Sequence, residues 1–477
     1  MIHVSEDCDV YAKWGSATYI TITIDQSYLN KAPLIYTAAL DMTGNAKITL
    51  PIVDNKGSIY DSVFGCTYGF SDKKQTGEFG TIKYFGGTEC KFTKDTTLYR
   101  VLNEYGGGSG TEADPYIISS YDQLLRLAEQ GAKGCFIQTA DIKFPNSVDR
   151  KPINTVTISK GYENKSYNFF VYDGQGYSIK NLSGSGGLFG TIAASTIKNI
   201  VVDGANINSQ GYNNVGAICN DVVSYAYPSS SGNGYFATGN SRIINCTVKN
   251  SKISGNGADN IGGICGYGGA IADSFASGVS ISGGDCVGGI VGNACSVTGC
   301  LANNITVTDS VDSSGGIAGT AYGVILYDKS NNSYSSGGSI IGCGVRTFVA
   351  SATNSGGIVG TATSDTNFAY IKSCYAANIF LSGENNGGII GADGNNGYAH
   401  RITYCLVDNA NNYPVIGGDD VRSVAKVMVL SVPADTGLTV DGVLSVLNAA
   451  SSGYSYWTRS DGENGGYPYP QKIGALK

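Results

Sequence analysis

Histidine is almost missing from this sequence, which contains only His3 and His400 in 477 residues. The two lie far apart along the chain, and neither an HExxH nor a GxSxG motif occurs. Both a histidine-based catalytic triad and a His-rich zinc site are therefore disfavoured, because each needs imidazoles at set positions. Cysteine spacing of the CxxC kind, which is typical of structural zinc sites, is also absent.

Charged residues are scarce as well, at 14% of the chain, and they leave a net charge of -7. The sequence has no run of Lys and Arg, whereas nucleic-acid binding needs clustered positive charge. We therefore expect neutral partners.

The sequence also lacks an apolar run of about 18 residues and a basic-then-apolar leader at Met1. We expect a fragment of a larger protein, with no membrane insertion and no signal of its own.

Glycine, in contrast, is abundant, with 68 copies, and much of it belongs to one phrase that occurs seven times. Self-similarity on this scale predicts a solenoid. The copies are Gly186–Gly190 (GGLFG), Val215–Cys219 (VGAIC), Gly262–Gly266 (GGICG), Gly288–Gly292 (GGIVG), Gly315–Gly319 (GGIAG), Gly356–Gly360 (GGIVG) and Gly387–Gly391 (GGIIG).

Two further columns recur between these phrases. One places an apolar residue three positions before a small one, as in Ile243/Cys246, and the other places two residues at a step of two, as in Ile379/Leu381. A step of two is the period of a strand with one face inward. Three short strands in a shortest repeat of 26 residues predict one turn of a triangular parallel β-helix. Its coils should rise about 4.8 Å each, and we expect the right-handed form.

The phrase GGI-x-G, in register over about half of the chain, resembles the GLUG motif of large bacterial surface proteins. The resemblance implies a β-solenoid at the cell surface and identifies an architecture better than an activity. The predicted fold class is therefore all-β, a right-handed parallel β-helix with short helical caps and a small N-terminal β-rich module.

Thirteen cysteines would suggest a disulfide framework in an exported protein, but their register argues otherwise. One column is shared by Cys246, Cys300, Cys343, Cys374 and Cys405 with Ile200 and Ser274. Cysteines that replace small apolar residues behave as buried free thiols. We predict that this column fills the core and stays reduced.

The N-terminal part contains a second kind of repeat. Asp9–Trp14 (DVYAKW) is similar to the phrase that begins at Asp95, and both resemble the last strand of a β-grasp-like surface repeat of bacterial adhesins and internalins. We interpret residues 1–14 as the tail of an upstream repeat and residues 15–104 as a complete module. Alternating runs at 19–24 and 46–50 predict small antiparallel strands within it.

The remaining boundaries follow from caps and joints. Residues 105–168 are predicted to hold a Gly-rich joint, a capping helix and a first coil, with Ser120 and Gln123 as a capping box. Residues 169–420 are predicted to form the β-helix with its GLUG-like repeats. Residues 421–477 are predicted to cap its other end, with a helix at 440–450.

The long insertions of the repeat all fall between the glycine phrase and the next small-residue column, so all of them should leave the solenoid at one corner. Tyrosine among Ser, Asn and Gly is typical of binding loops, although the same rings could simply pack on the solenoid. The insertions are 220–241, 320–339, 361–370 and 392–401. Their candidate ligand-binding residues are Tyr225, Tyr227, Tyr235, Phe236, Tyr322, Tyr327, Tyr334, Phe368, Tyr370, Tyr398 and His400.

Carboxylates form one more column, three positions before the glycine phrase, at Asp259, Asp285, Asp312 and Glu384. Turn formation explains Asp and Asn at such positions, and also Asp173 in its Asp-Gly pair. A weak calcium site on the column is a less favoured alternative, because adjacent copies offer few ligands at one level.

We therefore predict a non-enzymatic, extracellular and monomeric fragment of a bacterial surface protein, without cofactor or metal. It would act as an adhesin or ligand-binding solenoid for a host or neighbouring-cell glycan or protein. The alternatives are a carbohydrate-active β-helix enzyme, either a polysaccharide lyase or a hydrolase, and a passive stalk.

Overall fold

The computed structural model divides into two compact units, Met1–Gly107 and Gly108–Lys477. The structure describes residues 16–470 except 28–31, 52–59, 62–65, 75–82, 85–86, 104, 131, 146–151, 154–155, 158–165, 168–169, 194, 224–225, 229–234, 238–240, 311, 323, 328–332, 337–338, 364–369, 395–400, 409–410, 419–429, 433–441, 450–456, 459–463 and 465–466. The predicted upstream tail at 1–14 thus lies outside the described residues.

The first unit is a five-stranded sheet with a separate two-stranded ribbon. The sheet has the order β2 (Leu34–Ala39), β1 (Tyr19–Ile24), β7 (Thr96–Asn103), β5 (Cys66–Ser71) and β4 (Tyr60–Asp61), and β3 (Ala46–Thr49) pairs with β6 (Glu89–Phe92). Ile20, Ile22 and Ile24 alternate into the core beside Phe70 and Leu98. The prediction of antiparallel strands is correct for β1–β2 and wrong for β1–β7, which run parallel because a long crossover separates them.

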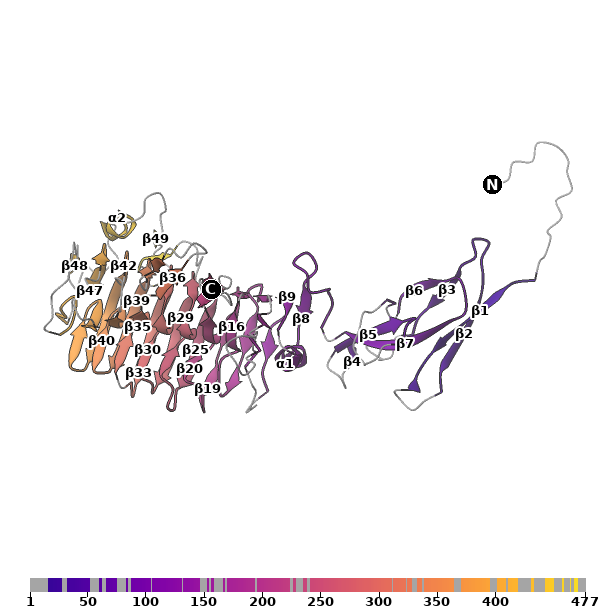
Figure 1. Ribbon diagram of the computed structural model, residues 1–477, viewed down its shortest axis with the longest axis horizontal. Coiled ribbons are helices and arrows are strands. Elements are labelled where there is room, and N and C mark those ends of the chain that lie inside the picture. The colour runs from indigo at the N-terminus through magenta and orange to yellow at the C-terminus, as the bar shows by residue number, and fades with distance from the viewer. Residues whose placement is uncertain are drawn as a thin grey trace, which may run out of the picture. The chain divides into compact units, whose positions relative to one another are not determined.

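The second unit is a solenoid of parallel strands, so the predicted parallel β-helix is confirmed (Figure 1). Four sheets, named I to IV in the order in which a coil visits them, run along it. Sheet I holds β20 (Asn214–Gly216), β26 (Asn260–Gly262), β30 (Cys286–Gly288), β34 (Ser313–Gly315), β40 (Asn354–Gly356) and β44 (Asn385–Gly387). Sheet II holds β16 (Phe189–Ala193), β21 (Cys219–Val223), β27 (Cys265–Gly268), β31 (Val291–Ala294), β35 (Ala318–Tyr322), β41 (Val359–Thr363) and β45 (Ile390–Asp393).

The other two sheets extend to both ends of the solenoid. Sheet III holds β8 (Tyr116–Ile118), β9 (Gly134–Gln138), β13 (Phe170–Asp173), β17 (Ser195–Lys198), β24 (Arg242–Ile244), β28 (Ala270–Ala272), β32 (Ser296–Thr298), β38 (Ser339–Ile341), β42 (Tyr370–Lys372) and β46 (Arg401–Thr403). Sheet IV holds β10 (Ile142–Lys143), β14 (Ser178–Lys180), β15 (Ser183–Gly184), β18 (Val201–Asp203), β19 (Asn206–Asn208), β25 (Thr247–Ser254), β29 (Phe275–Ser282), β33 (Leu301–Thr308), β39 (Gly344–Ser351), β43 (Tyr375–Ser382), β47 (Leu406–Asp408) and β48 (Leu430–Val432). Two short hairpins, β11 (Val156–Thr157) with β12 (Ser166–Tyr167) and β49 (Trp457–Thr458) with β50 (Tyr469–Pro470), lie outside these sheets.

The prediction of three strands per repeat is corrected to four in the regular coils. The glycine phrase contributes two strands instead of one, because its glycines form a sharp corner between sheets I and II. A Cβ on Gly262 would lie 2.0 Å from the carbonyl oxygen of Cys265, so no larger residue fits this corner. The isoleucine that follows points into the core, and Ile264, Ile290 and Ile317 are fully buried.

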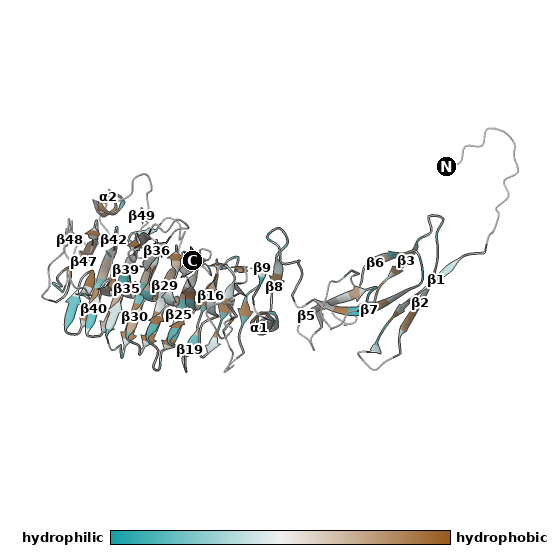
Figure 2. Ribbon diagram, viewed as in Figure 1, coloured by the Kyte–Doolittle hydropathy of each residue, from teal (hydrophilic) through white to brown (hydrophobic). Residues whose placement is uncertain are grey.

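Hydrophobic and hydrophilic residues alternate along the solenoid strands (Figure 2), as the period of two predicts. The corner between sheets III and IV is made by residues with positive φ, such as Asn199, Asn245 and Asp273 at 56°, 51° and 50°. Short polar side chains tolerate this conformation. They also bond along the column, since Asn245 Nδ2 donates to Asn199 Oδ1 at 2.8 Å.

The cysteine column lies in the core, as predicted. Cys246, Cys300, Cys343, Cys374 and Cys405 are free and fully buried. The Cys246 thiol donates to the carbonyl of Ile244 at 3.4 Å, and the Ser274 hydroxyl donates to the matching carbonyl of Ala272 at 2.7 Å. A small side chain with one weak donor therefore suits this position, which explains why Cys and Ser exchange there.

The N-terminal cap is confirmed. Helix α1 (Tyr121–Gln130) begins with the predicted cap at Ser120, whose Oγ accepts from Gln123 N–H at 3.3 Å. The Gln123 side chain bonds one residue earlier than a capping box predicts, since its Oε1 accepts from Ser119 N–H at 2.6 Å. The Tyr121 ring packs edge-on against Phe144 of the first coil, with 5.0 Å between centroids. α1 thereby covers apolar core that the first coil would otherwise expose.

The described C-terminal segment divides between two places: β48 extends sheet IV beyond β47 at the end of the solenoid, and the rest packs on its side. Helix α2 (Gly442–Ala449) matches the predicted helix, but it packs with Trp457 on the side of the solenoid, against Leu301, Tyr375 and Leu406 of sheet IV (Figure 1). Trp457 Nε1 donates to the carbonyl of Ser373 at 3.0 Å. The lateral position arises because sheet IV has apolar residues on its outer face here. Neither described helix is long and apolar enough to cross a membrane.

Replacing Ile290 by Asp should destabilise the solenoid by about 4 kcal/mol, because the carboxylate would be buried without a partner between Ile264 and Ile317. Urea unfolding followed by circular dichroism measures this. The matched control is Lys252→Ala at an exposed position of β25, which should change stability by less than about 0.5 kcal/mol. Equal stability of the two variants would contradict the assigned strand register.

The buried thiols should resist alkylation in the folded protein at about pH 8, because burial raises the pKa of Cys246 to about 12 and raises those of Cys343, Cys374 and Cys405 well above their usual value. Burial of these thiols in the neutral form contributes fully to stability below about pH 8.5, the pKa of a cysteine in the unfolded chain. The contribution is lost as the pH rises further, because the thiols ionise more readily in the unfolded chain. When the protein is denatured without reductant and then alkylated, mass spectrometry should find all four cysteines labelled. A disulfide between any two of them would contradict the core assignment.

Candidate functional site

The insertions leave the solenoid at one corner, as the sequence predicts. All four connect a strand of sheet II to the next strand of sheet III, namely β21 to β24, β35 to β38, β41 to β42 and β45 to β46. In the coil between β27 and β28 the same connection is the single residue Gly269. The corner can therefore hold connections of very different length without a change in the strands on either side.

The two longest insertions each contain a β-hairpin. In the first, β22 (Ala226–Pro228) pairs with β23 (Tyr235–Ala237), and Tyr227 lies opposite Phe236. In the second, β36 (Val324–Tyr327) pairs with β37 (Ser333–Ser336). The Cα atoms of β23 and β36 come within 8 Å of each other, so the two hairpins lie side by side. We call this pair the hairpin surface.

The structure brings most of the described candidate residues to this region. Tyr227, Tyr235, Phe236, Tyr327 and Tyr334 are on the strands of the hairpin surface, and Tyr322 ends β35, from which the second hairpin leaves. Tyr370 begins β42 and is 37% exposed. The other candidates, Tyr225, Phe368, Tyr398 and His400, lie outside the described residues.

The predicted carboxylate column is present at the turn before sheet I. Asp259, Asp285 and Asp312 are exposed and lie on consecutive coils. Asp285 N–H donates to the carbonyl of Asp259 at 3.1 Å, and Ser313 N–H donates to that of Asp285 at 2.7 Å. These backbone bonds join neighbouring coils and hold the column in register, and the turn role of its side chains stays a prediction. Within the part of the chain that the structure describes, no three His, Cys, Asp or Glu side chains gather as metal ligands would.

Asp173 also occupies the turn that the sequence predicts. Its Oδ1 accepts from Gln175 N–H at 3.0 Å and from Asn199 Nδ2 at 2.8 Å, and its Oδ2 lies 3.1 Å from Lys198 Nζ. Burial raises the pKa of Asp173, but the hydrogen bonds and the lysine outweigh it and the pKa lies below its usual value. Asp173 is therefore ionised at neutral pH and is a poor proton donor.

Asp221 is a feature that the sequence analysis missed. It lies in the concave corner between sheets I and II, where Asn214 Nδ2 donates to its Oδ1 and Thr191 Oγ1 donates to its Oδ2 at 3.2 Å. Burial raises its pKa, although these two bonds act in the opposite direction. Similar polar contacts continue along the corner, as between Ser313 Oγ and Thr361 Oγ1 at 2.6 Å. This corner is thus a hydrogen-bonded polar seam.

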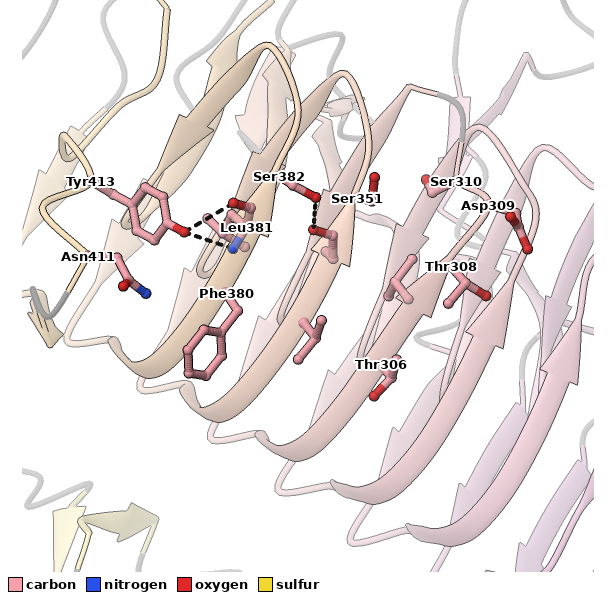
Figure 3. Close-up of a pocket in the computed structure, with 13 residues that line it drawn as sticks. Thr306, Thr308, Asp309, Ser310, Ser351, Phe380, Leu381, Ser382, Asn411 and Tyr413 are labelled. Atoms are coloured by element: carbon pink, nitrogen blue, oxygen red, sulfur yellow. Dashed lines mark hydrogen bonds between the residues drawn. The ribbon is translucent and has the colours of Figure 1, made fainter.

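A groove on the outer face of sheet IV was also missed, and we call it the Phe380 groove. It crosses β33, β39 and β43, is bounded by the segment at Asn411 and Tyr413, and has a volume of about 620 Å³ (Figure 3). Phe380 and Val349 line it and are 54% and 41% exposed. A volume of this size is within the usual range of small-ligand sites, about 300–1,000 Å³.

The wall of the Phe380 groove is fixed by hydrogen bonds to the edge of β43. Leu381 N–H donates to Tyr413 Oη at 2.9 Å, and Tyr413 Oη donates to the carbonyl of Leu381 at 3.0 Å. Asn411 Nδ2 donates to the carbonyl of Ile379 at 2.7 Å. Two side chains thereby occupy backbone groups that a further strand would otherwise bond.

The sequence contained a signal for this groove. The inward columns include Phe348/Ala350 and Ile379/Leu381, so the residues between them, Val349 and Phe380, had to face outward. Two large apolar side chains at outward positions of neighbouring strands indicate a surface that binds a ligand or a partner. The inward columns alone do not reveal this groove.

No protein-family model and no curated protein sequence matches the chain. A solved structure described as a putative immunoglobulin A1 protease from Bacteroides ovatus is 19% identical, with 78% of this chain and 96% of that chain covered and a TM-score of 0.45. One described as IgA1 protease is 16% identical, with coverage of 71% and 22% and a TM-score of 0.33. The catalytic domain of a GH87 alpha-1,3-glucanase in complex with nigerose is 12% identical, with coverage of 82% and 92% and a TM-score of 0.19.

The prediction that the chain is not an enzyme is corrected by these comparisons. The aligned chains include proteins described as proteases and as a glucanase catalytic domain. Each TM-score is below 0.5, so none of these likenesses assigns a reaction or a site to this chain. The non-enzymatic interpretation is withdrawn, and catalysis has to be tested directly.

Proposed function

We propose that the chain is part of an extracellular bacterial surface protein of the GLUG-repeat kind, and that its solenoid binds a ligand on host or neighbouring cells. The hairpin surface is the proposed contact region. The observation that carries this proposal is the approach of β23 to β36, which joins insertions from different coils into one surface.

The composition of the insertions supports a binding role. Tyr and Phe supply large contact area with few rotatable bonds, and the surrounding Ser, Asn and Gly supply adaptable hydrogen bonding. The stacked coils supply a rigid base. The two hairpins leave it at β21 and β35, which are three coils apart, and each coil rises about 4.8 Å. A net charge of -7 and the scarcity of charged residues favour a neutral ligand over an anionic one.

Truncating Tyr227 and Tyr327 together to Ala should weaken binding by about 1 kcal/mol or more for each ring, because aromatic anchors dominate such contacts. Binding of the fluorescently labelled protein to a mammalian glycan array and to fixed epithelial cells is the measurement. The melting temperature should stay within a degree or two of the parent value if the rings face the ligand.

Tyr177→Ala, a 39% exposed ring on a distant coil, is the matched control and should bind like the parent. A fall in melting temperature that parallels the loss of binding would show that Tyr227 and Tyr327 are packing groups. Unchanged binding of the double variant would refute the hairpin surface as the contact region.

A carbohydrate-active enzyme is the second candidate function, and the carboxylate column favours it. Asp259 and Asp285 lie on consecutive coils, which rise about 4.8 Å. Retaining glycosidases hold their two carboxyl groups about 5–5.5 Å apart, with one as nucleophile and one as acid and base. A stacked pair of aspartates is therefore close to the geometry that this reaction needs.

On this second proposal, incubation with a polysaccharide panel should release reducing sugar, and Asp285→Asn should lower the rate at least about 100-fold by removing one carboxylate of the pair. The control is Asp203→Asn, a carboxylate of sheet IV that is paired with Lys249 at 3.7 Å and lies outside the column. Equal rates for the parent and the Asp285 variant would remove the column from consideration.

A further inference from the structure

In the Phe380 groove an outward-facing column changes from polar residues to the apolar Val349 and Phe380. Thr306, Val349 and Phe380 are in register on β33, β39 and β43. On the two preceding coils the same column holds Lys252 and Ser280, which are polar. The change to exposed apolar residues is therefore local to the groove.

A row of hydroxyl groups runs beside this column, two residues further along each strand. It consists of Thr308, Ser351 and Ser382, and these residues also line the groove (Figure 3). Ser382 Oγ donates to the carbonyl of Ala350 at 3.4 Å and keeps its lone pairs for a second partner. The groove thus offers an apolar strip and a strip of hydroxyl donors and acceptors, with the coil spacing as their common period.

One end of the groove contains a polar group without a partner. Ser310 is 9% exposed, and among the described residues its Oγ has no hydrogen-bond partner. Buried hydroxyl groups are normally bonded, so an unbonded one indicates a missing partner.

The charge of the lining limits the ligand further. Among the described residues that line the groove, Asp309 is the one carboxylate, and none of them is Lys, Arg or His. An anionic ligand would find no cation to neutralise it and would approach Asp309 unfavourably. A neutral ligand with apolar faces and hydroxyl edges matches the two strips.

A peptide strand is disfavoured as the occupant. Added strands bind through unpaired backbone groups at a sheet edge, but Tyr413 and Asn411 already bond the edge of β43 beside the groove. Those bonds also hold the groove in shape, which reduces the ordering cost of binding.

We propose that the Phe380 groove binds a neutral oligosaccharide along the solenoid axis. The CH face of a sugar ring packs on Phe380 and Val349, and sugar hydroxyls bond Thr308, Ser351 and Ser382. This site is separate from the hairpin surface, which uses the corner between sheets II and III.

The test is isothermal titration calorimetry of the whole chain with cellotetraose, laminaritetraose, maltotetraose, xylotetraose and mannotetraose, and with tetragalacturonate as an acidic counterpart. At least one neutral sugar should bind. Phe380→Ala should weaken that binding at least about tenfold, and Thr308→Val should weaken it less, because the first variant removes the ring platform and the second one hydroxyl group. The melting temperature of both should match the parent, since Phe380 is 54% exposed.

Tyr177→Ala is the matched control, because it also removes an exposed ring, 39% exposed, but outside the groove. It should bind the neutral sugar like the parent, and so should the Tyr227/Tyr327 double variant, which separates this inference from the hairpin surface. Any of three results would overturn the proposal: no binding of the neutral sugars, binding of tetragalacturonate alone, or equal binding by Phe380→Ala. Sedimentation that shows a parent dimer and a Phe380→Ala monomer would also overturn it, in favour of a second copy as occupant.

Discussion

Hydrogen bonding from coil to coil is the constraint on which the solenoid depends. Each regular strand pairs with the equivalent strand of the next coil, as β27 does with β31. The corner between sheets I and II is bonded in the same way, since Ile264 N–H donates to Ile290 O at 2.9 Å and Ile290 N–H donates to Ile317 O at 3.0 Å. The register therefore repeats, and every position of the repeat becomes a column of equivalent residues. Residues of one chemical type consequently repeat at the same position of successive coils. Isoleucine repeats in the core, asparagine at the corner with positive φ, a thiol or hydroxyl beside it, and aspartate before sheet I.

The columns explain how much of the structure the sequence could predict. Ile290 has a fixed place in the glycine phrase, and Cys343 belongs to a column of apolar and small residues, so their burial follows from the pattern alone. The common origin of the insertions follows in the same way, because one interval of the repeat changes greatly in length and the other by only a few residues. The helix cap at Ser120 is local in sequence and was predicted with its hydrogen bond.

What the pattern could not predict depends on backbone approaches and on contacts from outside the repeat. The glycine phrase makes a corner, and hence a fourth sheet, because the carbonyl of Cys265 approaches Gly262 too closely for any side chain. The C-terminal segment lies on the side of sheet IV because Gly344 leaves room for the ring of Tyr375, whose hydroxyl donates to the carbonyl of Pro468 at 2.8 Å. The approach repeats at Gly288, Gly315 and Gly356, but it is a contact of the backbone that residue spacing alone does not reveal. The pairing of Tyr375 lies outside the repeat. The same holds for the Phe380 groove, whose wall comes from outside the repeat.

The corner between sheets II and III gives the fold a property of practical use. One coil passes it with the single residue Gly269, and another does so with a hairpin, while the strands on both sides keep their register. Doubling the length of a flexible loop costs only about 0.6 kcal/mol in closure entropy. The coil at Gly269 is therefore a natural point at which to graft a foreign loop, and successive coils would display such grafts in a line at strand spacing. In evolutionary terms, the lineage of this chain could change what the corner displays without changing the core that supports it.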